Sequence, residues 1–193
     1  MAAQTVFAQD DKPQENMIQG EFVAPADSFP RVRYFESDKI TLNDRCPVRK
    51  VPLNPKMTPV YVNGLPIGFC WSPCAKIFVQ GPEVFLNDLE LSVNCVVNTN
   101  QKAQLDPEHR VFVNWETYYF SDNKAVKKFN KSAYKFTGKL TDPVSQKRFQ
   151  PDKKSPSRTI DGRLFYFLNK DNALAFDADP DAFVTPVVGM KKM

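Results

Sequence analysis

Three stretches of this chain align with one another without gaps, and this repeat constrains the fold more than any other feature of the sequence. The stretches are residues 60–70, 111–121 and 158–168. The same register continues to two later Phe positions in each copy, which are Phe78, Phe129 and Phe176, and then Phe85, Phe136 and Phe183. Chance rarely repeats such a series of positions, so we expect three diverged copies of one unit of about 45 residues.

Each copy also opens in a similar way, with the sequences Cys46-Pro47-Val48, Cys95-Val96-Val97 and Asp142-Pro143-Val144. The repeat thus predicts a flexible N-terminal arm, three units in series and a short tail. The predicted boundaries are 1–40 for the arm, 41–90 for the first unit with its cysteines, 91–138 for the second unit, 139–186 for the third unit and 187–193 for the tail. The arm is rich in Gln, Asp, Glu and Pro and lacks the periodicity of a packed segment.

Each unit begins with the pattern of a short β-hairpin. Apolar strands meet at Asn63-Gly64 in the first copy and at Asp161-Gly162 in the third. These dipeptides favour a two-residue turn because both positions tolerate positive φ. The second copy has Asn114-Trp115 at this place. Trp is a poor residue for such a turn, so we expect a looser loop there.

A helix is expected after each hairpin, because a polar capping signal precedes apolar residues at three- and four-residue spacing. The capping signals are Ser72-Pro73, Asp122-Asn123 and Asn169, and the signals that end the first and third helices are Gly81-Pro82 and Pro180. One such unit is too small for a stable core, whereas three units can bury their aromatic faces against one another. The sequence therefore predicts an α+β protein of three consecutive small β-hairpin–helix units after a flexible arm.

Three of the four cysteines, Cys46, Cys70 and Cys74, fall in the first copy. Cys70 ends the second predicted strand, and Cys74 follows in the first helical turn, so both sulfurs can face one ion. Cys46 precedes the hairpin and can fold back beside them. The positive end of the helix dipole also favours thiolates at this place. We therefore predict one site for a soft metal ion, Zn²⁺ or Cu⁺, with Cys46, Cys70 and Cys74 as ligands.

The fourth ligand of this site stays open. A structural zinc site normally has four protein ligands, and the candidates for the fourth are Cys95 and Asp44. With only three protein ligands, a water molecule or a ligand from a partner completes the coordination. Two other interpretations of the cysteines are a reduced cluster without metal and a disulfide.

Several of these residues resemble the YHS and TRASH-like families of small metal-binding domains. The resemblance of the first copy lies in Cys46-Pro47-Val48, Tyr61-Val62-Asn63-Gly64, Ile67-Gly68-Phe69-Cys70 with Cys74, Phe78, and Pro82 with Phe85. The third copy is similar to the YHS form through Asp142-Pro143-Val144, Leu164-Phe165-Tyr166-Phe167, Phe176, and Pro180 with Phe183. Over the three copies, the resemblance covers residues 43–184.

This resemblance implies a treble-clef-like, YHS-type fold around metal-coordinating cysteines. It also implies a place among metal-handling, metal-sensing or exported bacterial proteins. Carried over by position, Cys46, Cys70 and Cys74 are the metal ligands. The other two copies depart from the pattern, and the residues at their later cysteine positions are Ser121, Ala125, Leu168 and Asn172. These copies cannot bind metal in the same way and are expected to keep the fold through aromatic packing.

Composition and motifs narrow the class of protein. The formal net charge is +4 and basic residues are interspersed with acidic ones, so we expect no nucleic-acid partner. No apolar stretch is long enough to span a membrane. The single histidine, His109, is interpreted as a surface residue, and the sequence has no nucleophile–base motif or phosphate-binding loop. We therefore do not expect an enzyme.

The N-terminal sequence leaves localisation open between two interpretations. Residues 1–9 resemble the end of a secretory signal peptide, with Val6 and Ala8 at the positions that precede a cleavage site. This interpretation predicts a periplasmic or secreted protein. The other interpretation is a short leader on a cytoplasmic protein.

Together, these patterns predict a non-catalytic metal-binding protein in metal handling or sensing, with one Zn²⁺ or Cu⁺ ion in the first unit. The alternative is a structural or protein-interaction module of degenerate repeats, in which any metal only stabilises the fold. The aromatic residues that persist in the copies without the cysteine set motivate this alternative. In that case the partner is another protein.

Overall fold

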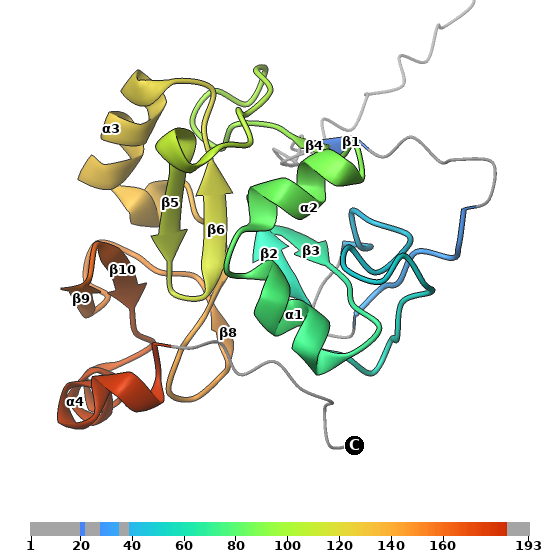
Figure 1. The fold of residues 1–193 in the computed structure, drawn as a ribbon. Coiled ribbons are helices and arrows are strands. Elements are labelled where there is room, and N and C mark those ends of the chain that lie inside the picture. Colours follow the sequence, from blue (N-terminus) through green and yellow to red (C-terminus); the bar gives the residue numbers. More distant parts are fainter. Residues whose placement is uncertain (1–19, 22–27, 35–38, 185–193) are drawn as a thin grey trace, which may run out of the picture.

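The computed structural model describes residues 20–21, 28–34 and 39–184. Within these residues the chain is an α+β protein with four α-helices and a mixed six-stranded sheet (Figure 1). Most of the predicted arm lies outside the described residues, as do the predicted tail and the signal-like segment at 1–9. In the described part of the chain, every helix is too short or too polar to cross a membrane.

The sheet consists of three β-hairpins side by side (Figure 1). Their strands are β2 (Val60–Val62) with β3 (Leu65–Ile67), β5 (Arg110–Val113) with β6 (Glu116–Tyr119), and β9 (Ser157–Ile160) with β10 (Arg163–Tyr166). The strand order is β3-β2-β6-β5-β10-β9. Strands within a hairpin are antiparallel, whereas β2 pairs with β6 and β5 pairs with β10 in parallel. The first strand of one hairpin thus pairs with the second strand of the next, and all three share one sheet.

Each hairpin closes through a two-residue turn. The first turn residues are Asn63, Asn114 and Asp161, with φ values of 47°, 52° and 49°. The prediction of a looser loop at Asn114-Trp115 is wrong, because Val113 pairs directly with Glu116. Asn tolerates the left-handed conformation that the turn requires. The Trp115 indole Nε1 is held in place by donating to the carbonyl oxygen of Phe183 at 2.8 Å.

A helix follows each hairpin, as predicted. These helices are α1 (Ser72–Phe78), α3 (Asn123–Lys131) and α4 (Lys170–Ala178). The Asp122 side chain caps α3 by accepting from the Ala125 amide at 2.7 Å. The Asn169 side chain caps α4 by accepting from the Asn172 amide at 2.9 Å. Helix α1 differs from the expectation, since its N-cap is Trp71 and it has no side-chain cap.

The chain beyond α1 forms a helix that the sequence pattern did not indicate. Gly81-Pro82 ends α1 as expected, but a new helix, α2 (Pro82–Asp88), begins there. Pro is favourable in the first helical turn because its missing N–H needs no partner there. The later units have short 3₁₀ turns at the same place, η2 (Ala133–Lys135) and η3 (Pro180–Ala182). The other elements are β1 (Gly20–Glu21), β4 (Ser92–Val93), β7 (Leu140–Thr141), β8 (Arg148–Phe149) and η1 (Pro107–His109).

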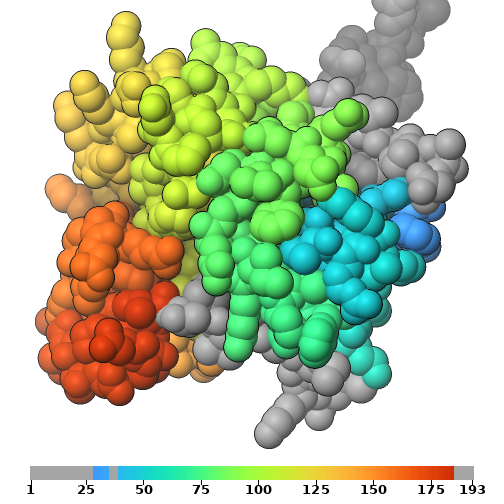
Figure 2. Space-filling view, in the orientation of Figure 1, coloured from blue at the N-terminus to red at the C-terminus, as the bar shows by residue number. Residues whose placement is uncertain are grey.

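Each unit has its own hydrophobic core built around a trio of Phe rings. The central rings are Phe78, Phe129 and Phe176, and their neighbours are Phe69 with Phe85, Phe120 with Phe136, and Phe167 with Phe183. Ring centroids within the trios lie 4.9 to 6.1 Å apart, a range in which tilted aromatic pairs are stabilising. Positions that align in the sequence therefore occupy equivalent places in three cores. Figure 2 shows the units as neighbouring blocks, cyan to green for the first, yellow-green to yellow for the second and orange to red for the third.

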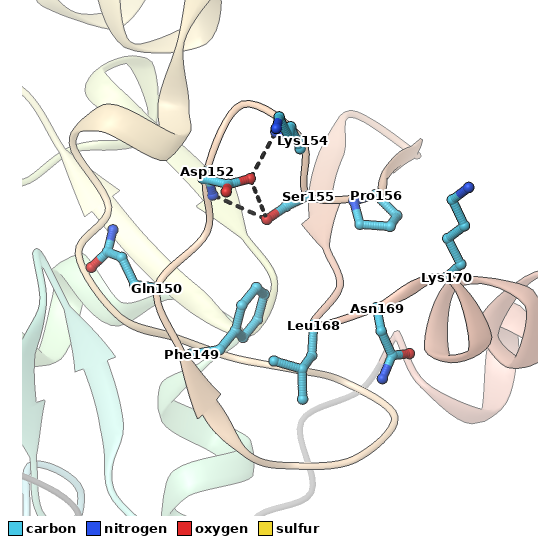
Figure 3. A pocket seen from close by; sticks show the side chains of 9 residues that line it. All are labelled: Phe149, Gln150, Asp152, Lys154, Ser155, Pro156, Leu168, Asn169 and Lys170. Carbon is cyan, nitrogen blue, oxygen red and sulfur yellow. Dashed lines mark hydrogen bonds between the residues drawn. The ribbon is translucent and has the colours of Figure 1, made fainter.

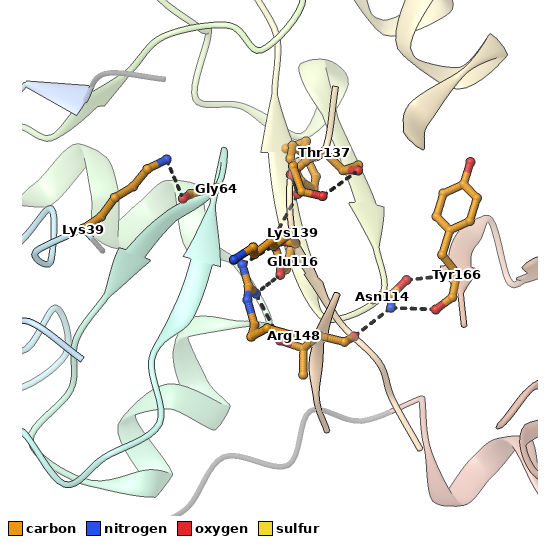
Figure 4. Close-up of polar contacts among 11 residues, drawn as sticks. Lys39, Gly64, Asn114, Glu116, Thr137, Lys139, Arg148 and Tyr166 are labelled. Carbon is orange, nitrogen blue, oxygen red and sulfur yellow. Dashed lines mark hydrogen bonds and ion pairs between the residues drawn. The ribbon is translucent and has the colours of Figure 1, made fainter. Parts of the chain in front are cut away.

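One polar network joins the three units. Arg148 of β8 forms an ion pair with Glu116 of β6, whose side chain is only 2% exposed (Figure 4). The Arg148 guanidinium also lies 3.7 Å from the ring centre of Tyr61 in β2. Tyr118 donates to the Glu116 carboxylate at 3.0 Å. Breaking a buried ion pair of this kind leaves an uncompensated charge, so the network fixes how the hairpins pack.

Candidate metal centre

The structure brings the three cysteines of the first unit together. The Sγ atoms of Cys46, Cys70 and Cys74 all lie within 4.8 Å of one another, and those of Cys70 and Cys74 are 3.7 Å apart. All four cysteines of the chain are free thiols. Sulfurs around a tetrahedral ion with Zn–S distances of about 2.3 Å are separated by about 3.8 Å. The cluster therefore has the spacing of a site for one soft metal ion.

Cys46 lies in a tight turn that directs backbone amides at its sulfur. The Lys50 amide donates to the Cys46 carbonyl oxygen at 2.8 Å, and Lys50 adopts a left-handed φ of 58°. Within this turn the amides of Val48 and Arg49 donate to the Cys46 sulfur. A third donor is the backbone amide of Cys70, on the opposite side of the site. The sulfur thus sits in a cradle of N–H groups, which stabilises a negative charge.

These donors decide which thiol ionises first. Burial alone raises the pKa of Cys46, but the three backbone hydrogen bonds outweigh it, and the pKa falls below its ordinary value. Burial, followed by the negative charge of Cys46, raises the pKa of Cys74 to about 12. Burial, followed by the hydrogen bond to Cys46, also raises the pKa of Cys70. Cys46 is therefore the first of the three thiols to ionise, and a bound cation must displace the protons that Cys70 and Cys74 retain.

Cys70 and Cys74 lie on either side of the start of α1. Cys70 follows Phe69, whose buried ring packs on Phe78 of α1 and so fixes the end of the hairpin against the helix. Cys74 lies in the first turn of α1, as predicted. Helix α1 has only 7 residues, and the amide donors to the Cys46 sulfur are those of Cys70, Arg49 and Val48, which all lie outside it.

The site lies near the surface of the first unit. Cys46 and Cys74 are buried, whereas Cys70 is half-buried. The adjacent Trp71 is 57% exposed. An ion can therefore approach from the side of Cys70, and a further ligand can bind from the same side.

The structure places both candidates for the fourth ligand in other contacts. The Asp44 carboxylate pairs with Arg45 at 3.0 Å and accepts from the Phe29 amide at 2.9 Å. Cys95 packs in the core of the second unit, and its sulfur accepts from the Asn98 amide at 3.4 Å. Within residues 28–34 and 39–184, the only group of side chains spaced to share one ion is the cysteine trio.

The third unit has a carboxylate where the first unit has the Cys46 sulfur. Asp142 Oδ1 accepts from the amides of Val144 at 3.0 Å and Ser145 at 2.7 Å. Asp142 Oδ2 accepts from the Leu168 amide at 2.7 Å. Leu168 aligns with Cys70, so the carboxylate receives the same three backbone donors as the sulfur. The turn residue Gln146, with φ of 59°, corresponds to Lys50.

The later cysteine positions carry no ligand chemistry in the other units. In the third unit, Asn172 replaces Cys74, and its side-chain nitrogen is buried without a hydrogen-bond partner. In the second unit, Ser121 accepts from the Asn98 side chain at 3.1 Å, and Ala125 is buried in the core. The structure thus concentrates the thiols in the first unit.

The pocket of the third unit and the single histidine are the two features to consider beside the expectation that the protein is not an enzyme. A pocket of 610 Å³ lies in the third unit beside Phe149 and Leu168 (Figure 3). The carboxylate in its wall, Asp152, accepts from the Lys154 amide at 2.7 Å and thereby shapes a loop. His109, expected at the surface, is only 12% exposed and lies 2.9 Å from Asp106, which caps η1.

The sequence pattern missed the groups that hold the cysteines in place. The amide donors of the Cys46 turn are backbone atoms, but the alignment of Cys46 with Asp142 is a signal that this position accepts hydrogen bonds as an anion. Asn43 also supports the site, because its side chain donates to the Gly68 carbonyl oxygen two residues before Cys70. No pattern in the sequence connects these two residues.

Comparison with protein-family models, with curated proteins and with solved structures gave no match.

Proposed function

We propose that this protein is a non-catalytic metal-binding protein in metal handling or sensing. It binds one soft ion, Zn²⁺ or Cu⁺, through Cys46, Cys70 and Cys74. The single observation that carries the proposal is the group of three sulfur atoms within 4.8 Å of one another. Thiolate sulfur is a ligand that suits both ions, and the three sulfurs lie at the spacing that one such ion requires.

The exposure of the site supports exchange of the ion with a partner. Three thiolates satisfy a trigonal Cu⁺ ion and leave one position open on a tetrahedral Zn²⁺ ion. Cys70 and the neighbouring Trp71 face the solvent side of the cluster. A water molecule or a ligand from another protein completes the coordination from this side.

The resemblance to YHS and TRASH-like domains agrees with this proposal. It assigns the same three cysteines as ligands and a treble-clef-like form to each hairpin–helix unit. The second and third units serve as scaffold or as a surface for a partner. Export to the periplasm or secretion, supported by the signal-like residues 1–9, forms part of the same proposal.

Metal analysis of the full chain under reducing conditions tests the proposal. Reconstituted wild-type protein is expected to retain one equivalent of Zn²⁺ or Cu⁺ after gel filtration, and Cys70→Ser is expected to retain none. Cys95→Ser is the matched control, because it removes a buried cysteine from the equivalent turn of the second unit. The proposal fails if wild-type protein retains no metal or if Cys70→Ser retains a full equivalent.

A second candidate is a structural or protein-interaction module in which the metal only stabilises the fold. The observation that favours it is the single sheet shared by all three hairpins, two of which belong to units without the cysteine set. Exchange kinetics separate the two functions. A handling site releases Zn²⁺ to a competing chelator while the chain stays folded, whereas a purely structural site releases it only at the rate of unfolding.

A further inference from the structure

We infer that Asn43 is a positioning residue of the metal centre, since its side-chain amide ties the segment that carries Cys46 to the segment that carries Cys70. This inference rests on the proposed metal-binding function. The buried side-chain amide of Asn43 would thus set the distance between Cys46 and Cys70, two ligands that lie far apart in the sequence.

The contacts of Asn43 form a clasp between the two segments. Its side-chain nitrogen donates to the carbonyl oxygens of Arg45 at 2.9 Å and Gly68 at 2.8 Å. Its side-chain oxygen accepts from the Gly68 amide at 2.9 Å. Arg45 immediately precedes Cys46, and Gly68 lies two residues before Cys70. Asn43 is fully buried, so no water competes for these bonds.

The same clasp occurs twice more in the chain. The Asn63 side chain donates to the carbonyl oxygens of Asn94 at 2.8 Å and Tyr119 at 2.9 Å, and it accepts from the Tyr119 amide at 2.7 Å. Asn94 precedes Cys95 as Arg45 precedes Cys46, and Tyr119 aligns with Gly68.

The third clasp belongs to Asn114 (Figure 4). Its side chain donates to the carbonyl oxygens of Thr141 at 2.7 Å and Tyr166 at 2.9 Å, and it accepts from the Tyr166 amide at 2.8 Å. Thr141 precedes Asp142, the residue equivalent to Cys46. In all three units, therefore, a buried side-chain amide joins the opening turn to the end of the second strand.

The source of the amide differs between the units. Asn63 and Asn114 are turn residues of the preceding hairpin, so each of these clasps also joins two units. The first unit has no preceding hairpin in the described residues, and Asn43 supplies the amide from the segment just before Cys46. Thr41 supports this segment by donating from its hydroxyl to the Asn43 carbonyl oxygen at 2.7 Å.

Only the Asn43 clasp spans two proposed metal ligands. Without it, fewer bonds hold the turn around Cys46 to the end of β3, and the ion must bear more of the cost of bringing the ligands together. Residues that orient metal ligands typically change metal affinity by about 10- to 100-fold when they are replaced. Loss of the Asn114 clasp has the same chemistry but touches no ligand segment.

The experiment compares Asn43→Asp with the matched variant Asn114→Asp in the full chain. Each substitution keeps the shape of the side chain and removes the donor to two carbonyl oxygens. Zn²⁺ affinity, measured by competition with a chromophoric chelator under reducing conditions, is expected to fall about 10- to 100-fold in Asn43→Asp. In Asn114→Asp it is expected to stay within about twofold of wild type, although both variants lose thermal stability.

A spectroscopic signature separates positioning from general destabilisation. The thiolate-to-metal charge-transfer bands of the Co²⁺-substituted protein are expected to shift or weaken in Asn43→Asp and to match wild type in Asn114→Asp. Asn43→Ser removes the same bonds without a buried charge, and the same criteria apply to it if Asn43→Asp does not fold.

The outcomes separate this inference from the proposed function. If wild-type protein binds no Zn²⁺, the proposed function itself fails. If wild-type protein binds Zn²⁺ and both Asn43 variants bind it equally well, only the positioning role of Asn43 is overturned. Equal losses of affinity in the Asn43 and Asn114 variants overturn it as well, because they indicate a global effect.

Discussion

The first and third units solve the same structural problem with different chemistry. In the first unit, backbone amides of the opening turn and of Cys70 point at the sulfur of Cys46. In the third unit, equivalent amides point at the two oxygens of Asp142, and the amide of Leu168 completes the set at 2.7 Å. The Asp142 carboxylate satisfies these donors with two oxygens, whereas the Cys46 sulfur satisfies them with one atom that lies within 4.8 Å of two further thiols.

The comparison of the two units distinguishes the backbone contacts that stabilise the turn from the side chains that would bind the ion. The cradle of amides occurs with a carboxylate in the third unit, so it does not depend on metal. The third unit closes its turn with an internal anion and needs no cation. In the first unit three thiols lie close together, so that the ionisation of one disfavours the ionisation of the others. Burial, followed by the charge of Cys46, raises the pKa of Cys74 to about 12. A bound cation relieves this opposition, which predicts that only the first unit depends on metal.

Metal removal has the largest expected effect, and we expect it to act on the first unit and not on the third. Chelation of the reconstituted protein removes the stabilisation that the bound ion gives to the first unit, while the chain as a whole is expected to stay folded. Hydrogen exchange read by mass spectrometry is expected to show lost protection around Cys46 and α1. Protection around Asp142 and α4 is expected to persist, and equal loss in both units contradicts the account.

Grafting the cysteines tests whether the two turns are truly equivalent. The triple variant Asp142→Cys, Leu168→Cys and Asn172→Cys places three thiols at the positions of the first unit's set. Because the backbone donors are already present, we expect a second equivalent of Zn²⁺ per chain by elemental analysis. A variant that folds but still binds a single equivalent shows that the third unit lacks the required geometry. The single variant Asp142→Cys, which supplies only one thiol, is the control and is expected to add no tight site.

Removal of the internal carboxylate has a smaller effect. Asp142→Ala leaves three backbone amides without their acceptor, which is expected to lower the free energy of unfolding by about 3 kcal/mol. Urea denaturation of the metal-loaded protein measures this loss. The metal content is expected to stay at one equivalent, and a lower content indicates that the units are coupled more strongly than the comparison allows.

The smallest effect concerns the position equivalent to Cys74. Asn172 in α4 has a buried side-chain nitrogen without a partner, so Asn172→Ala removes an unsatisfied group and improves helix propensity. Thermal unfolding is expected to show a gain of about 1 kcal/mol. The corresponding change Cys74→Ala is expected to abolish stoichiometric metal binding. A loss of stability in Asn172→Ala contradicts this expectation, because it shows that the Asn172 side chain makes a favourable contact.

The local features of the fold could be predicted from the sequence. The turn at Asn63-Gly64 and the helix cap at Asp122 depend on neighbouring residues, and the structure has both. The turn at Asn114 could not be predicted, because the indole of Trp115 is held by a carbonyl oxygen 68 residues away in sequence. Helix α2 was missed because Pro82 is compatible both with the end of one helix and with the start of another.

In the candidate site, too, some features could be predicted from the sequence and others could not. The three cysteines could be brought together from their places in one repeat, because Cys70 and Cys74 are close in sequence and the hairpin returns the chain towards Cys46. The supporting contacts could not, because the bonds between Asn43 and Gly68 span 25 residues. The YHS-like identity of the units stays a prediction.

Zinc K-edge X-ray absorption of the reconstituted full chain tests the central claim most directly. The account predicts a first shell of three sulfur atoms at about 2.3 Å, completed by one lighter atom. Cys95→Ser is expected to give the same spectrum as wild type. A first shell of nitrogen and oxygen atoms, or of fewer than three sulfurs, contradicts the claim that Cys46, Cys70 and Cys74 together bind the ion.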